Sequence, residues 1–225
     1  MKPVIAIRPE PGLAATIAAG AAEGIEIGGY PLSRVEPVEW QAPAPELFDG
    51  LLVGSANVFR HGGSALADLR NLPVLAVGET TAAAAEKAGF SVETTGSGGL
   101  QLLLDGLEPQ PRRLLRLAGE TRVSLHPPEQ VRLFERVVYR TVDLPMPDEM
   151  IRLLSANPLI LLYSAGAAKH FASECDRCGI ARGGIALAAL GPRILAAAGP
   201  GWQDARAAER PGEAQLLALA RHMCH

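Results

Sequence analysis

The sequence has few aromatic residues, few cysteines and no long apolar run. Phenylalanine, tryptophan and tyrosine make up 4% of its 225 residues, which leaves few surfaces on which nucleobases could stack. The formal net charge is −3, so we expect no general attraction to nucleic acid. Three cysteines are too few for a secreted disulfide framework and favour a reducing, cytoplasmic setting. No apolar stretch approaches the roughly 18 residues of a membrane span, so we expect no membrane partner.

Several enzyme motifs are also missing. The chain has no Walker A sequence, and Gly96-Ser97-Gly98-Gly99 lacks the spacing of a dinucleotide-binding loop. It has no G-x-S-x-G nucleophile elbow. Its five histidines show no metal-ligand spacing. The single C-x-x-C, Cys175–Cys178, has too few ligands nearby for zinc, and we interpret its thiols as half-buried on a helix. We therefore expect no metal and no cofactor.

Short apolar segments alternate with alanine-rich ones along the chain. Val4–Ile7 predicts a buried strand, and Pro11 predicts the start of a helix that ends near Gly24. Strands that are apolar throughout are typical of parallel sheets covered on both faces, so we predict doubly wound α/β architecture. The other predicted strands are Gly50–Val53, Val74–Val77, Leu114–Leu117, Val137–Tyr139, Leu159–Tyr163 and Ile185–Leu190, and the other predicted helices include Glu79–Ala88 and Ala167–Arg177.

An internal repeat gives more specific information. The segment Leu51–Ala56 is echoed by Leu161–Gly166, with the two Leu-Leu pairs aligned. The segment Ala76–Ala85 is echoed by Ala189–Ala198. Each copy continues with a glycine followed by an aromatic residue, and then with a glycine before a helical Leu-Leu pattern. Four features in the same order indicate a duplicated α/β domain.

The repeat also predicts a discontinuous domain. The second copy is too short for a complete sheet, and the N-terminal strand and helix have no domain of their own. Joining residues 1–36 to 145–225 restores a domain comparable in size to residues 37–144. The chain then crosses twice, in the proline-containing segments Tyr30–Val38 and Val138–Met150. We expect a hinged molecule with a cleft between its domains, where α/β proteins usually bind ligands.

Four junctions between a predicted strand and a predicted helix carry glycine or serine. Backbone N–H groups at such a helix start can bind phosphate or carboxylate. Ser55 and Ser164 could instead be simple N-caps, which would explain any one junction alone. Four junctions at the edges of two related sheets favour an anionic ligand. The junctions are Val53–Ala56, Val77–Thr80, Tyr163–Gly166 and Leu190–Arg193.

Arginines and one tyrosine lie beside these junctions. Arg8 follows the first strand, Arg122 follows Gly119-Glu120, and Arg193 lies in the last junction. Each arginine could bind a carboxylate or belong to ordinary solvated surface. Tyr139 lies at the return crossing, where it either packs at the hinge or directs its phenol into the cleft.

Taken together, these residues resemble the uroporphyrinogen-III synthase family over nearly the whole chain. The matching segments are weak one by one and specific only in their order and spacing. They are Leu51–Asn57, Ala76–Ala84, Arg116–Glu120, Val138–Thr141 and Ala189–Pro192, the last followed by Arg210-Pro211.

The resemblance implies two flavodoxin-like α/β domains joined by a two-stranded linker, the first domain discontinuous. It implies a lyase of porphyrin biosynthesis that cyclises hydroxymethylbilane, inverting the last pyrrole ring, to uroporphyrinogen III and water without a cofactor. It implies a monomer, with any contact with the preceding pathway enzyme transient, and a catalytic role for Tyr139. The expected substrate-binding residues are Arg8, Ser55, Ala56, Gly78, Thr80, Gly119, Arg122, Ser164, Ala165, Gly191 and Arg193.

The chain departs from the family's pattern in two places. Arg193 and Ile194 follow Gly191-Pro192 where the family usually has hydroxyl residues, so Arg193 is expected to bind a carboxylate there instead. Pro127-Pro128 predicts that the helix expected between Gly119 and Tyr139 is truncated. An alternative from another class is a non-catalytic, hinged two-domain protein that binds a small polyanion and needs no Tyr139.

Overall fold

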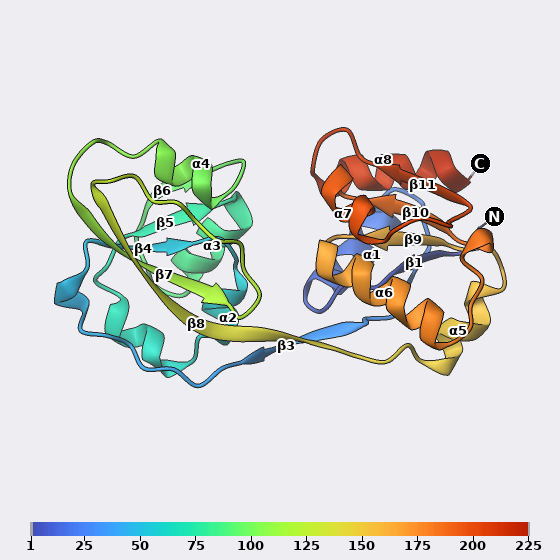
Figure 1. Cartoon of the computed structure of the whole chain (residues 1–225), viewed down its shortest axis with the longest axis horizontal. Coiled ribbons are helices and arrows are strands. Elements are labelled where there is room, and N and C mark those ends of the chain that lie inside the picture. Colours follow the sequence, from blue (N-terminus) through green and yellow to red (C-terminus); the bar gives the residue numbers. More distant parts are fainter. Residues whose placement is uncertain (1, 225) are drawn as a thin grey trace. The chain divides into compact units, whose positions relative to one another are not determined.

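The computed structural model of the chain describes residues 2–224. The chain forms two compact units, each with one sheet (Figure 1). The discontinuous unit consists of Met1–Arg34 and Val142–His225, and the continuous unit consists of Val35–Thr141. Among the described residues, none of the helices combines the length and the hydropathy needed to span a membrane.

The sheet of the discontinuous unit has five strands in the order β11-β10-β9-β1-β2. Every neighbouring pair is parallel. β1 pairs with β9, which confirms the prediction that Val4–Ile7 joins the sheet of Leu159–Tyr163. The strands are β1 (Val4–Ala6), β2 (Ile27–Gly29), β9 (Leu159–Leu162), β10 (Ala186–Ala189) and β11 (Asp204–Ala207).

Helices cover both faces of this sheet. Leu13 of α1 and Leu217 of α8 pack in one apolar layer, while Met150 of α5 and Phe171 of α6 pack in the other. Helix α6 begins two residues earlier than predicted because Ser164 caps it. The helices are α1 (Gly12–Ala22), α5 (Asp148–Leu154), α6 (Ala165–Arg177), α7 (Pro192–Ala197) and α8 (Glu213–Cys224), with a 3₁₀ turn at Arg182–Gly184.

The sheet of the continuous unit has the order β3-β8-β7-β4-β5-β6. Strands β4 to β8 pair in parallel, and β3 lies beside β8 at the edge (Figure 1). The strands are β3 (Ser33–Pro37), β4 (Gly50–Val53), β5 (Val74–Val77), β6 (Val92–Gly96), β7 (Arg112–Gly119) and β8 (Val131–Asp143). The helices are α2 (Asn57–His61), α3 (Glu79–Lys87) and α4 (Leu100–Asp105), with 3₁₀ turns at Pro45–Leu47 and Ser64–Leu69.

The predicted α/β class with parallel sheets is therefore confirmed. The central strands β4, β9 and β10 are buried at every residue, as their uninterrupted apolar sequences predict. Strand β8 is much longer than the predicted Val137–Tyr139. Exposed residues alternate with half-buried or buried ones over most of its length, and the charged side chains that broke up the apolar pattern lie mostly on its exposed positions.

The two sheets are related by a permutation of the chain. The order β11-β10-β9-β1-β2 corresponds to β6-β5-β4-β7-β8. Val53 and Leu162, the last residues of β4 and β9, each pair with the alanine that the sequence repeat had already matched. Gly54 therefore corresponds to Tyr163, and not to Ser164 as the repeat suggested. The sequence alignment was one residue wrong because it matched the two Leu-Leu pairs.

The two units differ between their fourth and fifth equivalent strands. In the discontinuous unit, α1 connects β1 to β2. In the continuous unit, residues 120–130 connect β7 to β8 and contain no helix. The sequence predicted a helix truncated by Pro127-Pro128, whereas the structure has no helix in this segment at all.

Candidate functional site

The carboxyl ends of β5, β4 and β7 lie side by side, because these strands are parallel neighbours in one sheet. This edge brings together five of the residues that the sequence predicted. Gly78 and Thr80 follow β5, Ser55 and Ala56 follow β4, and Gly119 ends β7. They come from three separate segments of the continuous unit.

Tyr139 joins this edge through direct contact with Gly119. The two residues are partners across β7 and β8, next to an irregularity between Ala118 and Gly119. The Glu120 backbone N–H donates to the Tyr139 carbonyl oxygen over 2.9 Å. A Cβ atom on Gly119 would lie 2.6 Å from Cε2 of Tyr139, so only glycine lets the ring lie this close. The half-buried ring of Tyr139 is thus fixed at the end of β7.

The turns after β5 and β4 are built differently. Gly78 has φ +82°, a conformation that other residues rarely adopt, and it leads directly into α3. The exposed Thr80 lies in the first turn of that helix, where the N–H groups lack partners in the preceding turn. At β4, the Ser55 Oγ accepts from the Asn57 backbone N–H over 3.2 Å, close to the capping role considered from sequence.

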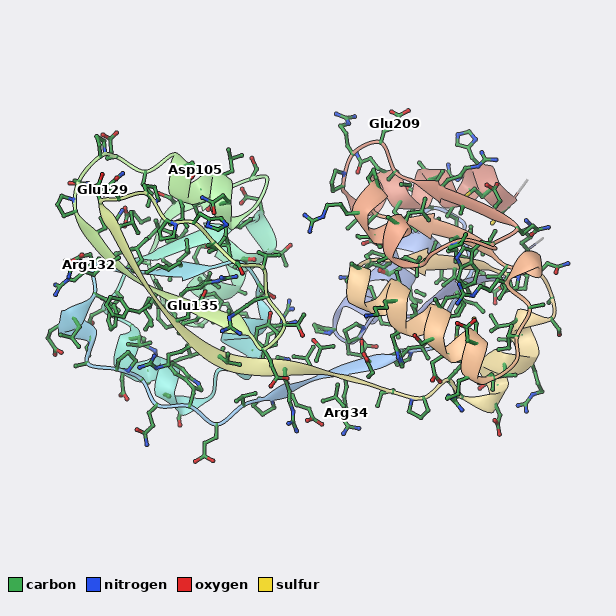
Figure 2. All side chains as sticks on the ribbon, in the orientation of Figure 1. Arg34, Asp105, Glu129, Arg132, Glu135 and Glu209 are labelled. Atoms are coloured by element: carbon green, nitrogen blue, oxygen red, sulfur yellow. The ribbon has the colours of Figure 1, made fainter. Side chains whose placement is uncertain are left out.

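Arg122 is engaged by another side chain of its own unit. Its Nε donates to Oε2 of Glu135 over 3.1 Å, and the other oxygen of that carboxylate, Oε1, accepts from Nη1 of the buried Arg116 over 2.6 Å. Burial opposes ionisation of Glu135, but hydrogen bonds from both guanidinium groups outweigh it and lower its pKa. Glu135, labelled on β8 in Figure 2, is therefore a shared carboxylate between two arginines.

The second group of predicted residues lies at the carboxyl edge of the discontinuous unit's sheet. Arg8 follows β1, Ser164 and Ala165 follow β9, and Gly191 and Arg193 follow β10, in the order in which these strands are neighbours.

Two of these residues, Ser164 and Arg193, differ in how their side chains are engaged. Ser164 caps α6, because its Oγ accepts from the Ala167 backbone N–H over 3.2 Å. Arg193 is exposed at the start of α7, and no hydrogen bond or ion pair joins its side chain to another residue in the described part of the chain.

Arg8 belongs to a polar cluster that the sequence did not reveal. Its guanidinium carbon lies 4.0 Å from the centre of the Tyr163 ring, and its Nη1 lies 3.3 Å from Oε2 of Glu213. The Tyr163 hydroxyl donates to Oε1 of Glu213 over 2.6 Å and accepts from Thr16 over 3.1 Å. Burial and the hydrogen bond to Glu213 raise the pKa of Tyr163. No local pattern signals this cluster, because its members lie far apart along the chain.

The C-x-x-C segment lies on and just beyond α6. Cys175 is fully buried rather than half-buried, and burial raises the pKa of its thiol to about 12. Cys178 is half-buried, as predicted. No group of three or more His, Cys, Asp or Glu side chains in residues 2–224 is placed to hold a metal ion.

The family model and the solved structures agree with each other. The family model for uroporphyrinogen-III synthase HemD matches residues 14–218. No curated protein matches the chain. The crystal structure of uroporphyrinogen-III synthetase from Helicobacter pylori 26695 has a TM-score of 0.66 at 17% identity, covering 99% of this chain and 100% of that chain. A mutant uroporphyrinogen III synthase from the extremely thermophilic bacterium Thermus thermophilus has a TM-score of 0.52 at 18% identity, covering 99% of both chains. At these identities the solved structures establish similarity of fold.

Proposed function

Because the chain belongs to the uroporphyrinogen-III synthase family, we propose that it converts hydroxymethylbilane to uroporphyrinogen III and water, inverting the terminal pyrrole ring. The observation that supports this most directly is the contact of Tyr139 with Gly119, which holds a phenol at the edge where three junctions meet. Tyr139 is the catalytic acid of this proposal.

In the proposed first step, the Tyr139 phenol donates its proton to the terminal hydroxyl of the substrate. Water leaves as the pyrrole nitrogen supplies electrons, giving an azafulvene. The substituted position of the last ring then attacks this carbon to form a spiro intermediate. That intermediate fragments and closes again with the last ring inverted, and loss of a proton restores the aromatic pyrrole. The protein positions the chain for the inverted closure and needs no cofactor for these steps.

The substrate's eight carboxylates account for the other proposed contacts. Backbone N–H groups near Ser55, Thr80 and Ala165 suit carboxylate oxygens, as does the exposed cation of Arg193. The guanidinium of Arg122 already binds Glu135, so we propose that it contributes mainly positive potential. We also propose that residues 1–36 with 145–225, and residues 37–144, act as two domains of a monomeric enzyme.

The test is an assay of hydroxymethylbilane consumption that separates the inverted from the unrearranged product. Wild-type protein is expected to form the inverted isomer. Tyr139→Phe keeps the ring but removes the proton, so kcat should fall about 100-fold, the low end of general acid catalysis. The product it forms should still be mainly inverted, because substrate shape enforces inversion.

Tyr30→Phe is the matched control, because the Tyr30 hydroxyl donates to Glu149 over 2.9 Å and is not part of the proposed site. It should retain wild-type turnover. Wild-type protein that binds the bilane without turning it over would favour a polyanion-binding protein instead. Full activity of Tyr139→Phe would reduce Tyr139 to a packing role.

A further inference from the structure

The Arg8 guanidinium is held in place by its neighbours, but only part of its hydrogen-bonding capacity is used within the described residues. The Tyr163 ring lies 4.0 Å from its guanidinium carbon, and Thr16 accepts from Nη1 over 3.2 Å, so two neighbours fix the plane of the group. The Arg8 side chain is nevertheless 29% exposed. Among contacts within residues 2–224, its hydrogen bonds use only Nη1 of the three guanidinium nitrogens.

The ion pair of Arg8 is also loose by the standard of this protein. It consists of one contact to Glu213, at 3.3 Å. Arg112 instead binds Glu93 through two hydrogen bonds of 2.8 Å each. A guanidinium has five N–H donors and binds carboxylates best in a two-bond, fork-like geometry. Arg8 can therefore still bind a carboxylate in this two-bond geometry, whereas Arg112 already binds Glu93 in that way.

Glu213 can leave Arg8 without losing all its partners. Its Oε1 accepts from the Tyr163 hydroxyl over 2.6 Å, and this bond does not involve Arg8. Glu213 is also the first residue of α8, where the helix dipole favours a negative charge, and it is 35% exposed. An exchange of carboxylates at Arg8 would thus leave neither charge buried and unpaired.

We propose that Arg8 binds one carboxylate of the octacarboxylate tetrapyrrole and that Glu213 is an internal competitor for this site. Glu213 neutralises Arg8 in the unliganded protein and gives way to an acetate- or propionate-type side chain of the ligand. After the reaction, it displaces the product carboxylate again. Glu213 is then a positioning residue that weakens ligand binding and speeds release. This inference rests on the proposed function for the identity of the ligand.

The test uses uroporphyrin I, a stable octacarboxylate tetrapyrrole, as the probe and measures its Kd by fluorescence quenching. Arg8→Gln should weaken binding about tenfold, the size expected for a hydrogen-bonded charge pair. Glu213→Gln keeps an acceptor for the Tyr163 hydroxyl but removes the charge, so binding should tighten about threefold. In the double variant the gain from Glu213→Gln should disappear, because no cation is left to be released.

Two further measurements separate binding from folding. Glu93 is the partner of the tightly paired Arg112, which is remote from Arg8 in the chain. The control variant Glu93→Gln should therefore leave the Kd unchanged. Arg8→Lys keeps the cation without the fork, so it should bind between wild type and Arg8→Gln. Thermal melting of each variant identifies any that is unfolded, and the conservative Glu213→Gln provides a test even if the Arg8 variants unfold.

The inference is wrong if folded Glu213→Gln binds uroporphyrin I no more tightly than wild type, or if its gain persists without Arg8. Turnover distinguishes this failure from failure of the proposed function. If the wild type makes the inverted isomer while the cycle of variants shows no coupling, only the carboxylate site is wrong. If the cycle shows the expected coupling but the wild type has no turnover, the carboxylate site stands and the synthase activity is wrong.

Discussion

Gly54 and Tyr163 occupy equivalent places at the ends of β4 and β9, but they do different things there. A Cβ on Gly54 would lie 2.9 Å from Leu100, the first residue of α4, so this position stays empty of side chain. Tyr163 instead extends to Glu213, the first residue of α8, with a hydrogen bond of 2.6 Å. The duplicated sheets keep the same layout, while the residue after the strand decides whether the edge is apolar or carries a polar cluster.

A second difference concerns the arginines of the two units. Arg116 on β7 is buried, and its Nη1 donates to the carbonyl oxygen of Val123 in the segment that replaces a helix. Its Nε has no hydrogen-bond partner within the described residues. Arg8, just after the equivalent strand β1, is partly exposed and loosely paired. A buried arginine needs its carboxylate for stability, whereas an exposed one keeps its charge available for a ligand.

The largest expected difference in stability follows from these two arginines. Glu135→Gln leaves the buried charge of Arg116 without its counter-charge and should cost about 3 kcal/mol in free energy of unfolding, the low end for a broken buried pair. Glu213→Gln in the discontinuous unit should cost less than about 1 kcal/mol, because Arg8 is partly exposed and can be solvated without it. Urea unfolding of the two variants measures both values. Equal losses would contradict the distinction between the two arginines.

Gly119→Ala tests whether the edge of the continuous unit depends on close packing of Tyr139. The new Cβ would lie 2.6 Å from the Tyr139 ring and force the phenol to move. We expect kcat to fall about 30-fold, about 2 kcal/mol in activation free energy, with KM less affected. Gly183→Ala is the control, since nothing lies within 4 Å of its added Cβ. Steady-state kinetics on both variants would show the effect, and unchanged kcat in Gly119→Ala would remove the argument for a fixed phenol.

Glu174 is a carboxylate held by several hydrogen bonds, in contrast to Glu213 of the same unit, whose ion pair with Arg8 is a single contact. It accepts two hydrogen bonds from Arg177, and the backbone N–H of Met146 donates to it over 2.6 Å. The hydrogen bonds from Arg177, with a smaller contribution from Met146, lower the pKa of Glu174 to about 2 despite its burial. Glu174→Gln should therefore lower the free energy of unfolding by about 1.5 kcal/mol at neutral pH.

The pH dependence of this loss follows from the sign of the shift. A carboxylate whose pKa is lowered by folding stabilises the protein above its ordinary pKa, 4.5, and loses this contribution as the pH falls toward 2. The difference between wild type and Glu174→Gln should shrink over that range, as measured by urea unfolding at several pH values. A difference that stays constant with pH would show that the ionised form is not what matters.

The smallest effects are expected from the equivalent serines Ser55 and Ser164. Ser164→Ala removes the cap of a long helix and should cost about 1 kcal/mol of stability, while Ser55→Ala, beside the short α2, should cost about 0.5 kcal/mol. Turnover of both should change less than about threefold, because the backbone N–H groups remain. Loss of turnover in either folded variant would instead indicate that a hydroxyl takes part in the chemistry.

The central strands could be predicted from sequence because each is an uninterrupted apolar segment flanked by glycine or serine. The outer strands could not. Ile27–Gly29 is short and rich in glycine, and Asp204–Ala207 begins with a charged residue. In Val92–Gly96, half-buried residues alternate with an exposed glutamate and an exposed threonine. Strands at or near a sheet's border are partly solvated, so their sequences resemble those of loops.

The residues of the candidate site also divide into those that could be predicted from sequence and those that could not. The glycines and serines that follow strands could be predicted, because a junction is a local pattern, and so could Tyr139, which lies within β8 opposite the end of β7. The contact of Tyr163 with Glu213 joins residues 50 positions apart, and that with Thr16 joins residues 147 apart. These contacts depend on β9 lying beside β1 in the sheet, and side-chain partners of this kind follow from strand order rather than from spacing along the chain.

The permuted order of strands also affects how the protein is assembled during synthesis. All strands of the sheet that contains β4 have been made once the ribosome has completed β8, so this sheet can form on the nascent chain. β1 and β2 emerge first but have only each other, and two three-residue strands do not hold together alone in water. They must remain without their other partner until β9, which follows β8 in the chain, has been made. β1 and β2 thus complete their sheet after the strands that follow them in the chain, and their exposed apolar residues are where chaperone binding and co-translational aggregation should concentrate.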